Sequence, residues 1–151
     1  MIRNIVIVDY KHWKKKIPNS QYFFDAIVKK FPRKYQFPKK KVIFSLLLSN
    51  NSEIKKLNQK FRNKKKHTDI LSFPYVNKNE LKKNFKKKEI YLGDIIISYQ
   101  HIYGKNFVKN KNLLVNTFVH GFLHLLGYDH IKNKDYIKMI KEEKKIIKNI
   151  I

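Results

Sequence analysis

The sequence contains no cysteine and has few acidic residues, glycines or prolines. Among 151 residues there are 11 Asp+Glu, four glycines and four prolines. Without cysteine, disulfides and thiolate-bound metals are excluded, which fits the reducing cytoplasm where we expect this protein. Long apolar runs are also missing, because stretches such as VIFSLLL (42–48) fall far short of the roughly 20 residues needed to span a bilayer. The first apolar run is short, ends at Asp9 and precedes the positive charges, so it is not a secretory signal. We therefore expect no association with a membrane.

Basic residues are abundant. The chain has 35 Lys+Arg and a formal net charge of +24. Such a charge attracts polyanions, namely RNA, DNA or an anionic membrane surface. Nearly all of the excess is lysine, and it accompanies many asparagines and isoleucines, as expected of an AT-rich genome. The charge is therefore explained either by a polyanionic partner or by genome composition.

The apolar pattern predicts a single α+β domain over residues 1–151, with a small mixed sheet of about four strands and about five helices. Alternating or apolar β-branched segments predict strands at 2–9, 41–49, 69–74 and 89–98, with a possible bulge at Gly93. Helical spacing predicts helices at 18–31, 52–62, 98–103, 110–126 and 134–151. The polar segment 77–88 is expected to be a surface loop.

Two of these helices have predicted inward faces. In the helix 52–62 the face consists of Ile54, Leu57 and Phe61. In the last helix it consists of Ile137, Ile140, Ile147 and Ile150.

Three of the six histidines lie in HGFLHLLGYDH (120–130). His120 and His124 are four residues apart on a predicted helix, so both rings lie on one face and can share a metal ion. Gly127 allows the chain to leave the helix, and His130 can return to the same point. This spacing is that of the metzincin zinc site, and three imidazoles suit Zn²⁺ with one open position, as in catalytic sites. A peptidase of that type has Glu after the first histidine; here the residue is Gly121, so the peptidase base is missing.

A second group of candidate residues lies in LNQKFRNKKKHTDILSFP (57–74). Arg62, among lysines that include Lys64, Lys65 and Lys66, can bind a phosphate with two hydrogen bonds. Alternatively, it is a solvated cation that complements the end of a helix. His67 is considered as a fourth ligand or an acid–base group, whereas Thr68 and Ser72 suit ordinary turns and caps.

Three carboxylates are candidates for supporting roles. Asp94 lies in an apolar strand, where burial without a partner is costly, so it can accept a hydrogen bond from a ligand histidine. Asp129 is a rival for this role. Asp69 and Asp129 are also candidate bases, and the third candidate is the zinc-bound hydroxide itself.

Together these motifs resemble the YbeY family of bacterial endoribonucleases. HGFLHLLGYDH is similar to the family signature H-G-x-L-H-L-x-G-Y-D-H. The elements LN (57–58), FR (61–62), Lys64, TD (68–69) and LSFP (71–74) correspond to the family's second motif, and LGDIIIS (92–98) to its third.

The resemblance implies a zinc-dependent, single-strand-specific endoribonuclease that matures the 3′ end of small-subunit ribosomal RNA and serves ribosome quality control. It implies one zinc ion held by His120, His124 and His130, and a functionally important arginine at Arg62. Our own hypothesis is that His120 and Arg62 are catalytic and that Lys64, Lys65 and Lys66 bind the RNA backbone. The expected partners are ribosomal RNA, the small ribosomal subunit and assembly factors, without DNA specificity. Two positions depart from the family: Lys65-Lys66-His67 replaces a common Asp-x-Pro, and Asn116 replaces a common His.

Two alternatives stay open at this point. The first is a zinc hydrolase of another class, such as a peptidase. The second is a non-catalytic ribosome-assembly factor with structural zinc. Within the endoribonuclease hypothesis, the nucleophile is either a zinc-activated water or the substrate's own 2′-OH.

Overall fold

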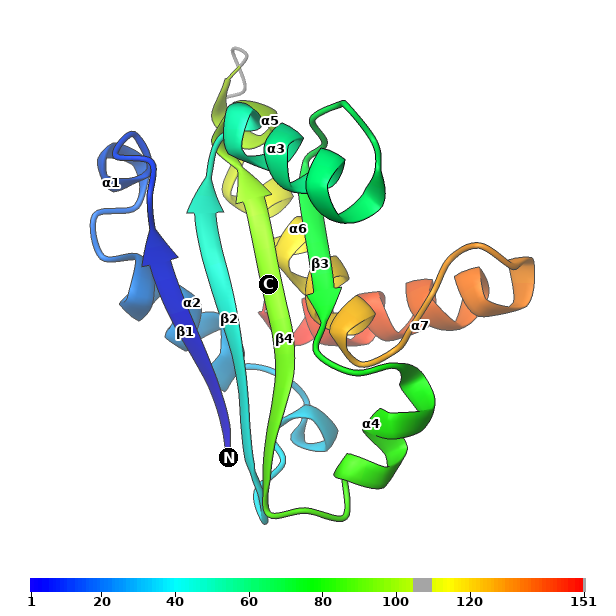
Figure 1. Ribbon diagram of the computed structural model, residues 1–151. Helices are drawn as coiled ribbons and strands as arrows, with labels where there is room; N and C mark the ends of the chain where they lie inside the picture. Colours follow the sequence, from blue (N-terminus) through cyan, green and yellow to red (C-terminus); the bar gives the residue numbers. More distant parts are fainter. Residues whose placement is uncertain (105–109, 151) are drawn as a thin grey trace.

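The computed structural model describes residues 1–104 and 110–150, which form a four-stranded sheet with helices on both faces (Figure 1). The strands are β1 (Ile2–Val8), β2 (Lys41–Ser49), β3 (Ile70–Pro74) and β4 (Glu89–Ser98), in the order β1-β2-β4-β3. β1 and β2 are parallel, as are β2 and β4, whereas β3 is antiparallel to β4. The predicted mixed α+β fold is confirmed, and β3 is an edge strand.

Seven α-helices lie in the described part of the chain. Five were predicted: α2 (Ser20–Lys29), α3 (Asn51–Arg62), α5 (Tyr99–Tyr103), α6 (Asn110–Leu125) and α7 (Asn133–Ile150). The other two are α1 (Trp13–Lys16) and α4 (Lys78–Asn84), and a short 3₁₀ turn covers Arg33–Tyr35. The predicted end of the last helix at residue 151 lies outside the described residues. No helix within the described residues has the length and apolarity needed to span a membrane.

The loop predicted at residues 77–88 is wrong, because α4 occupies most of it. Asn77 caps this helix by accepting a hydrogen bond from the backbone N–H of Glu80 at 2.9 Å, and Leu81 is buried. Asn77 and Glu80 have the spacing of a capping box, a signal that the polar composition of the segment obscured.

The main core lies between the sheet and the helices behind it, where α2 contacts β1 and α6 packs on β3 and β4 (Figure 1). Phe118 and Phe122 of α6 are fully buried there, next to Phe44 of β2. A smaller apolar cluster lies on the other face, where Ile54 of α3 packs against Leu71 and Ile96. The sheet is thus covered well on one face and only in part on the other.

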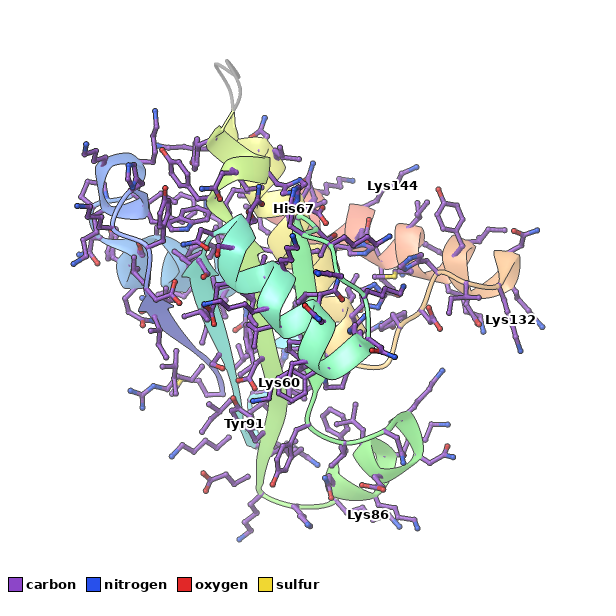
Figure 2. All side chains as sticks on the ribbon, turned by 45° about the horizontal axis from the view of Figure 1, so that its top comes forward. Lys60, His67, Lys86, Tyr91, Lys132 and Lys144 are labelled. Carbon is purple, nitrogen blue, oxygen red and sulfur yellow. The ribbon has the colours of Figure 1, made fainter. Side chains whose placement is uncertain are left out.

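Lysine side chains project from many parts of the surface, including Lys60, Lys86, Lys132 and Lys144 (Figure 2). Only four ion pairs are present among the described residues, and one of these is between a histidine and a glutamate. Most of the positive charge is therefore not neutralised within the chain.

Candidate metal centre

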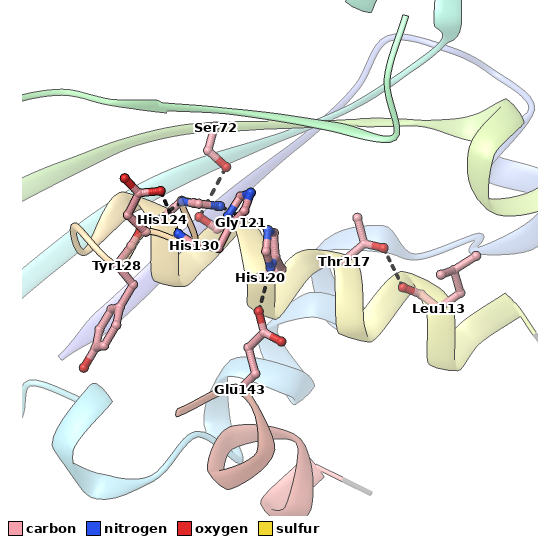
Figure 3. A network of polar contacts seen from close by, with 10 residues as sticks. Ser72, Leu113, Thr117, His120, Gly121, His124, Tyr128, His130 and Glu143 are labelled. Carbon is pink, nitrogen blue, oxygen red and sulfur yellow. Dashed lines mark hydrogen bonds and ion pairs between the residues drawn. The ribbon is translucent and has the colours of Figure 1, made fainter. Parts of the chain in front are cut away.

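The histidine cluster is built on the last two turns of α6 and the loop that follows them (Figure 3). The Nε2 atoms of His120 and His124 are 3.0 Å apart, as expected of residues one helical turn apart on one face. His130 returns to them, with ring centroids 5.4 Å from His120 and 5.0 Å from His124. The predicted convergence of the three rings is present in the structure.

Gly127 makes this return possible. The N–H of Gly127 bonds to the carbonyl of His124 at 3.0 Å, and the N–H of Tyr128 bonds to that of Leu123 at 3.1 Å. These two bonds form a Schellman motif, which needs a left-handed residue, and Gly127 has φ +92°. Asp129 then accepts hydrogen bonds from the N–H groups of His130 and Ile131 at 2.6 and 3.3 Å. The turn is thereby held in the conformation that brings His130 back.

Two of the rings are oriented by groups on the far side from the cluster. His120 Nδ1 lies 2.6 Å from Glu143 Oε1 of α7, and His124 Nδ1 lies 2.9 Å from the Tyr128 carbonyl (Figure 3). In both residues Nε2 is thereby turned into the cluster, as in metal-binding histidines whose other nitrogen is held by an oxygen atom. Sequence reasoning missed Glu143, because nothing local relates it to a histidine 23 positions earlier.

The cluster fits a zinc ion. One nitrogen from each histidine lies within 4.8 Å of the others, and this is the only group of at least three such ligands among the described residues. Two nitrogens bound tetrahedrally at about 2.1 Å lie roughly 3.4 Å apart, close to the observed 3.0 Å between His120 and His124. Burial, followed by the neighbouring His120 and His130, lowers the pKa of His124. His124 is therefore neutral at neutral pH, the form that binds metal.

Arg62 and the histidines line the same cavity of about 680 Å³. Arg62 is the last residue of α3, and its Nη2 donates a hydrogen bond to the Ser72 carbonyl of β3 at 2.7 Å. Ser72 Oγ in turn donates to the carbonyl of Gly121 on α6 at 3.3 Å (Figure 3). β3 therefore connects Arg62 to the helix that carries the histidines.

Of the remaining predicted residues, Lys64, Asp69 and Asp129 also line this cavity. Asp69 accepts a hydrogen bond from Thr68 at 3.1 Å. Lys65 and Lys66 are exposed on the adjacent loop and do not line the cavity. His67 is outside the cluster, with Nδ1 3.0 Å from His101 Nε2, so its interpretation as a fourth ligand is wrong.

Asp94 does not support a histidine. Its carboxylate accepts hydrogen bonds from the hydroxyls of Ser45 and Tyr91, on the face of the sheet opposite α6. The pairing of β2 and β4 shifts at Gly93, where φ is +135°. This bulge adds one residue, which turns Asp94 to the face opposite the one that strict alternation from Leu92 would give.

Gly121 is packed directly against the sheet. A Cβ atom here would lie 2.5 Å from Ile70 Cδ1, 3.1 Å from Ile95 Cγ2 and 3.2 Å from Ser72 Oγ. Any side chain at this position would therefore press against side chains of β3 and β4. The metzincin-like arrangement of this site is thus limited to the spacing of its histidines.

A neighbouring network holds α7 in place. The Tyr35 hydroxyl donates to Glu142 Oε2 at 2.5 Å, and Lys34 forms an ion pair with Glu142 Oε1 at 3.1 Å. Although burial raises the pKa of Glu142, these partners outweigh it and lower the pKa below its usual range. Because Glu142 precedes Glu143, this anchor also fixes the carboxylate that holds His120.

Comparison with known proteins identifies the family. The family model described as endoribonuclease YbeY matches residues 7–151. The chain belongs to the YbeY endoribonuclease family. It is 51% identical over 156 residues to the endoribonuclease YbeY of Pelagibacter ubique (strain HTCC1062), covering 99% of this chain and 97% of that protein. It is 35% identical over 91 residues to the endoribonuclease YbeY of Ehrlichia ruminantium (strain Gardel), covering 60% of this chain and 53% of that one.

The fold also agrees with a solved structure. The solution structure of TM1509 from Thermotoga maritima matches with a TM-score of 0.51 at 23% identity, covering 99% of this chain and 89% of that one. The predicted membership of the YbeY family is confirmed, and with it the enzyme class, a hydrolase of RNA phosphodiester bonds.

Proposed function

We propose that this protein is a zinc-dependent, single-strand-specific endoribonuclease that acts at the 3′ end of small-subunit ribosomal RNA and in ribosome quality control. Membership of the YbeY family supports the RNA substrate and the reaction class. The observation that carries the proposal is that Arg62 and the three histidines line one cavity. The proposed partners are the small ribosomal subunit and its assembly factors, in the cytoplasm, without a membrane or DNA specificity.

In this proposal His120, His124 and His130 hold the zinc ion. When bound, zinc acts as a Lewis acid that polarises a phosphoryl oxygen and lowers the pKa of water. The group consists of three imidazoles, and the oxygen atoms of Glu143 and Tyr128 contact the far nitrogens of two of these rings. Three imidazoles without a fourth protein ligand support a catalytic rather than a closed structural site.

Arg62 binds the scissile phosphate. A guanidinium carries five N–H donors, and the one hydrogen bond to Ser72 leaves others for phosphate oxygens. The same hydrogen bond holds the side chain at the cavity wall, so Arg62 can stabilise the charge that develops on the phosphate without reorganising. Lys64, on the same wall, adds a second cation.

A second depression, lined in part by lysines, adjoins the histidine cavity on the side of the loop that follows α6. It has a volume of about 450 Å³ and shares Gly127, Tyr128, Asp129 and Ile131 with the histidine cavity. It is also lined by Lys78, Lys132 and Lys138. These cations suit backbone phosphates of a strand that continues from the cavity, and such contacts carry no sequence information.

The candidate proton acceptors are Asp69 and Asp129, the two carboxylates at the cavity, or a hydroxide held at the site. If the acceptor acts on the 2′-OH of the substrate, the products have cyclic phosphates. If it acts on water, the expected products have 5′-phosphate ends and no cyclic phosphate is formed. Analysis of the product ends therefore separates the two nucleophiles.

The decisive experiment combines metal analysis of the purified protein with cleavage of single-stranded and duplex RNA. The wild type is expected to contain about one zinc ion per chain and to cleave single strands only. His124→Ala should lose both the metal and cleavage, and Asn116→Ala, an exposed residue on the same helix, should lose neither. Full cleavage by metal-free protein would refute the proposal.

The same experiment distinguishes the endoribonuclease from the alternative, a non-catalytic assembly factor with structural zinc. In that case, zinc-loaded wild type would not cleave RNA, and His124→Ala would lose its fold by circular dichroism. The peptidase alternative is disfavoured because position 121, where such an enzyme has its glutamate base, is a glycine. A side chain there would press against β3 and β4.

A further inference from the structure

The face of the sheet opposite α6 carries exposed aromatic side chains. Phe61, predicted to face inward, is 59% exposed, and Tyr75 is 69% exposed. Phe61 pairs with Phe73 at a ring-centroid distance of 5.6 Å, and Tyr75 pairs with Tyr91 at 5.5 Å. Exposing large aromatic rings to water is unfavourable, so a group of exposed rings indicates a binding surface.

A groove of about 520 Å³ is lined by the Phe61–Phe73 pair. Tyr75 and Tyr91 do not line it, but the Tyr91 hydroxyl bonds to Asp94, which does. Phe61 and Phe73 line it together with Leu57, Ile96 and Leu47, which form its apolar floor. The helix α3 covers only one end of this face of the sheet, and the rest is not covered by any described element (Figure 1). The groove is thus open along the sheet.

Cations lie directly over the rings that border the groove. Lys60 Nζ is 5.2 Å from the centre of the Phe61 ring, and Arg62 Cζ is 5.5 Å from that of Phe73. Lys60, in the last turn of α3, and Tyr91, on β4, lie on this same face (Figure 2). A flat ring beside a cation is the combination that binds a nucleotide, since the ring stacks on the base and the cation binds the phosphate.

The groove adjoins the histidine cavity through Arg62. This side chain lines the cavity, bonds to Ser72 of the edge strand β3, and lies over Phe73, which lines the groove. β3 is the edge strand of the sheet, with no further strand beyond it. An RNA strand that leaves the cavity can therefore cross the edge of the sheet at Arg62.

We propose that Phe61, Phe73 and Tyr75 form a stacking platform for the bases of single-stranded RNA on one side of the cleavage site. This inference rests on the proposed endoribonuclease function and extends it. Two carboxylates, Glu53 and Asp94, also line the groove and repel phosphates. The RNA backbone therefore runs along Lys60 and Arg62, with the bases turned toward the rings. Duplex RNA cannot use such a platform because its bases are already stacked, so the platform favours single strands.

The test uses Phe61→Leu and Tyr75→Leu, which keep an apolar side chain but remove the ring. Phe61→Tyr and Tyr75→Phe are the conservative partners, and Tyr22→Leu, at a tyrosine of α2 that is 72% exposed, is the matched control. Cleavage of single-stranded oligonucleotides should show KM raised roughly five- to thirty-fold per lost ring, with kcat unchanged. Phe61→Tyr, Tyr75→Phe and Tyr22→Leu should behave as the wild type.

A second measurement identifies the bases. Oligonucleotides with abasic sites on one side of the cleavage site should raise the KM of the wild type, and those with abasic sites on the other side should not. In Phe61→Leu, abasic sites on the side that raises the KM of the wild type should raise KM less, because one stacking partner of these bases is already missing. Equal KM for wild type and both leucine variants would overturn the proposal, whatever the result for abasic substrates.

Binding without cleavage separates this inference from the proposed function. Fluorescence anisotropy with labelled single-stranded RNA and metal-free protein should show weaker binding by Phe61→Leu than by Tyr22→Leu, even if the wild type does not cleave RNA. If the leucine variants bind RNA normally but bind intact small ribosomal subunits weakly, the face contacts a protein and the stacking proposal is wrong.

Discussion

The carboxylate of Glu143 lies 2.6 Å from Nδ1 of His120, a contact between α7 and α6 that orients a candidate metal ligand. Both side chains are largely shielded from solvent, with 22% and 32% exposed. A carboxylate on the far nitrogen fixes the ring and strengthens it as a ligand.

Replacing Glu143 by glutamine should therefore weaken metal binding without unfolding the protein. We expect the zinc affinity of Glu143→Gln to fall by about 10- to 100-fold, measured by competition with a chelator of known affinity. Glu89→Gln, at an exposed carboxylate of β4, is the control and should leave the affinity unchanged. A wild-type affinity in Glu143→Gln would mean that the contact does not serve the metal.

Arg62 is expected to contribute to the cleavage step in addition to binding the RNA backbone. Arg62→Ala should lower kcat by about 10²- to 10³-fold, the usual effect of removing one donor from a site of developing charge. Arg62→Lys should recover little of this loss, because an ammonium group cannot bond to Ser72 and bind a phosphate with two hydrogen bonds in the same geometry. Lys56→Ala, an exposed cation on the same helix, controls for the lost charge. Arg62→Ala with unchanged kcat would remove this residue from the reaction.

Gly121 should prove to be a packing position. Gly121→Ala places a methyl group 2.5 Å from Ile70 Cδ1, and such overpacking costs about 1–3 kcal/mol. For a chain of this size each kcal/mol lowers the Tm by about 2–4 °C, which calorimetry can measure. Adding Ile70→Val, which removes the Cδ1 atom, should restore part of the stability. If Gly121→Ala alone is as stable as the wild type, the close packing of α6 on the sheet is not needed.

The metal-free protein should lose stability as the solution is acidified. The pKa of His124 is lowered in the folded protein, mainly by burial, so the unfolded chain binds a proton more readily. The free energy of unfolding is then lost as the pH falls from about 6.5, the ordinary histidine value, through the folded pKa. Urea unfolding at a series of pH values should show this slope in the wild type. The free energy of unfolding should depend less steeply on pH in His124→Gln than in the wild type. If the two proteins show the same dependence, it arises from other titratable groups.

The histidine cluster is the part of the candidate site that could be predicted from local sequence. A spacing of four residues places His120 and His124 one turn apart in any helix, and Gly127 adopts the left-handed conformation that a helix end needs. The strands were also predicted nearly to their ends, because their apolar β-branched segments are local signals.

The partners of these residues could not be predicted, because they come from elements far away in the chain. The apolar spacing predicted that Ile137 faces inward, yet this side chain is 65% exposed and Met139, Glu142 and Ile146 are buried. The rotation of α7 that buries these residues is also what brings Glu143 to His120. Only packing against α6 and the 3₁₀ turn Arg33–Tyr35 decides this rotation.

The sequence by itself thus determined the histidine spacing, the helix end at Gly127 and the absence of a glutamate at position 121, since each depends on neighbouring residues. The tertiary structure decided that position 121 is closely packed, because Gly121 lies against side chains of strands some 25 to 50 positions earlier. It also decided that Asp94 faces away from the histidine cluster and that Arg62 lines the same cavity as the histidines. One bulge at Gly93 and one hydrogen bond to Ser72 set these directions, and neither can be derived from apolar periodicity.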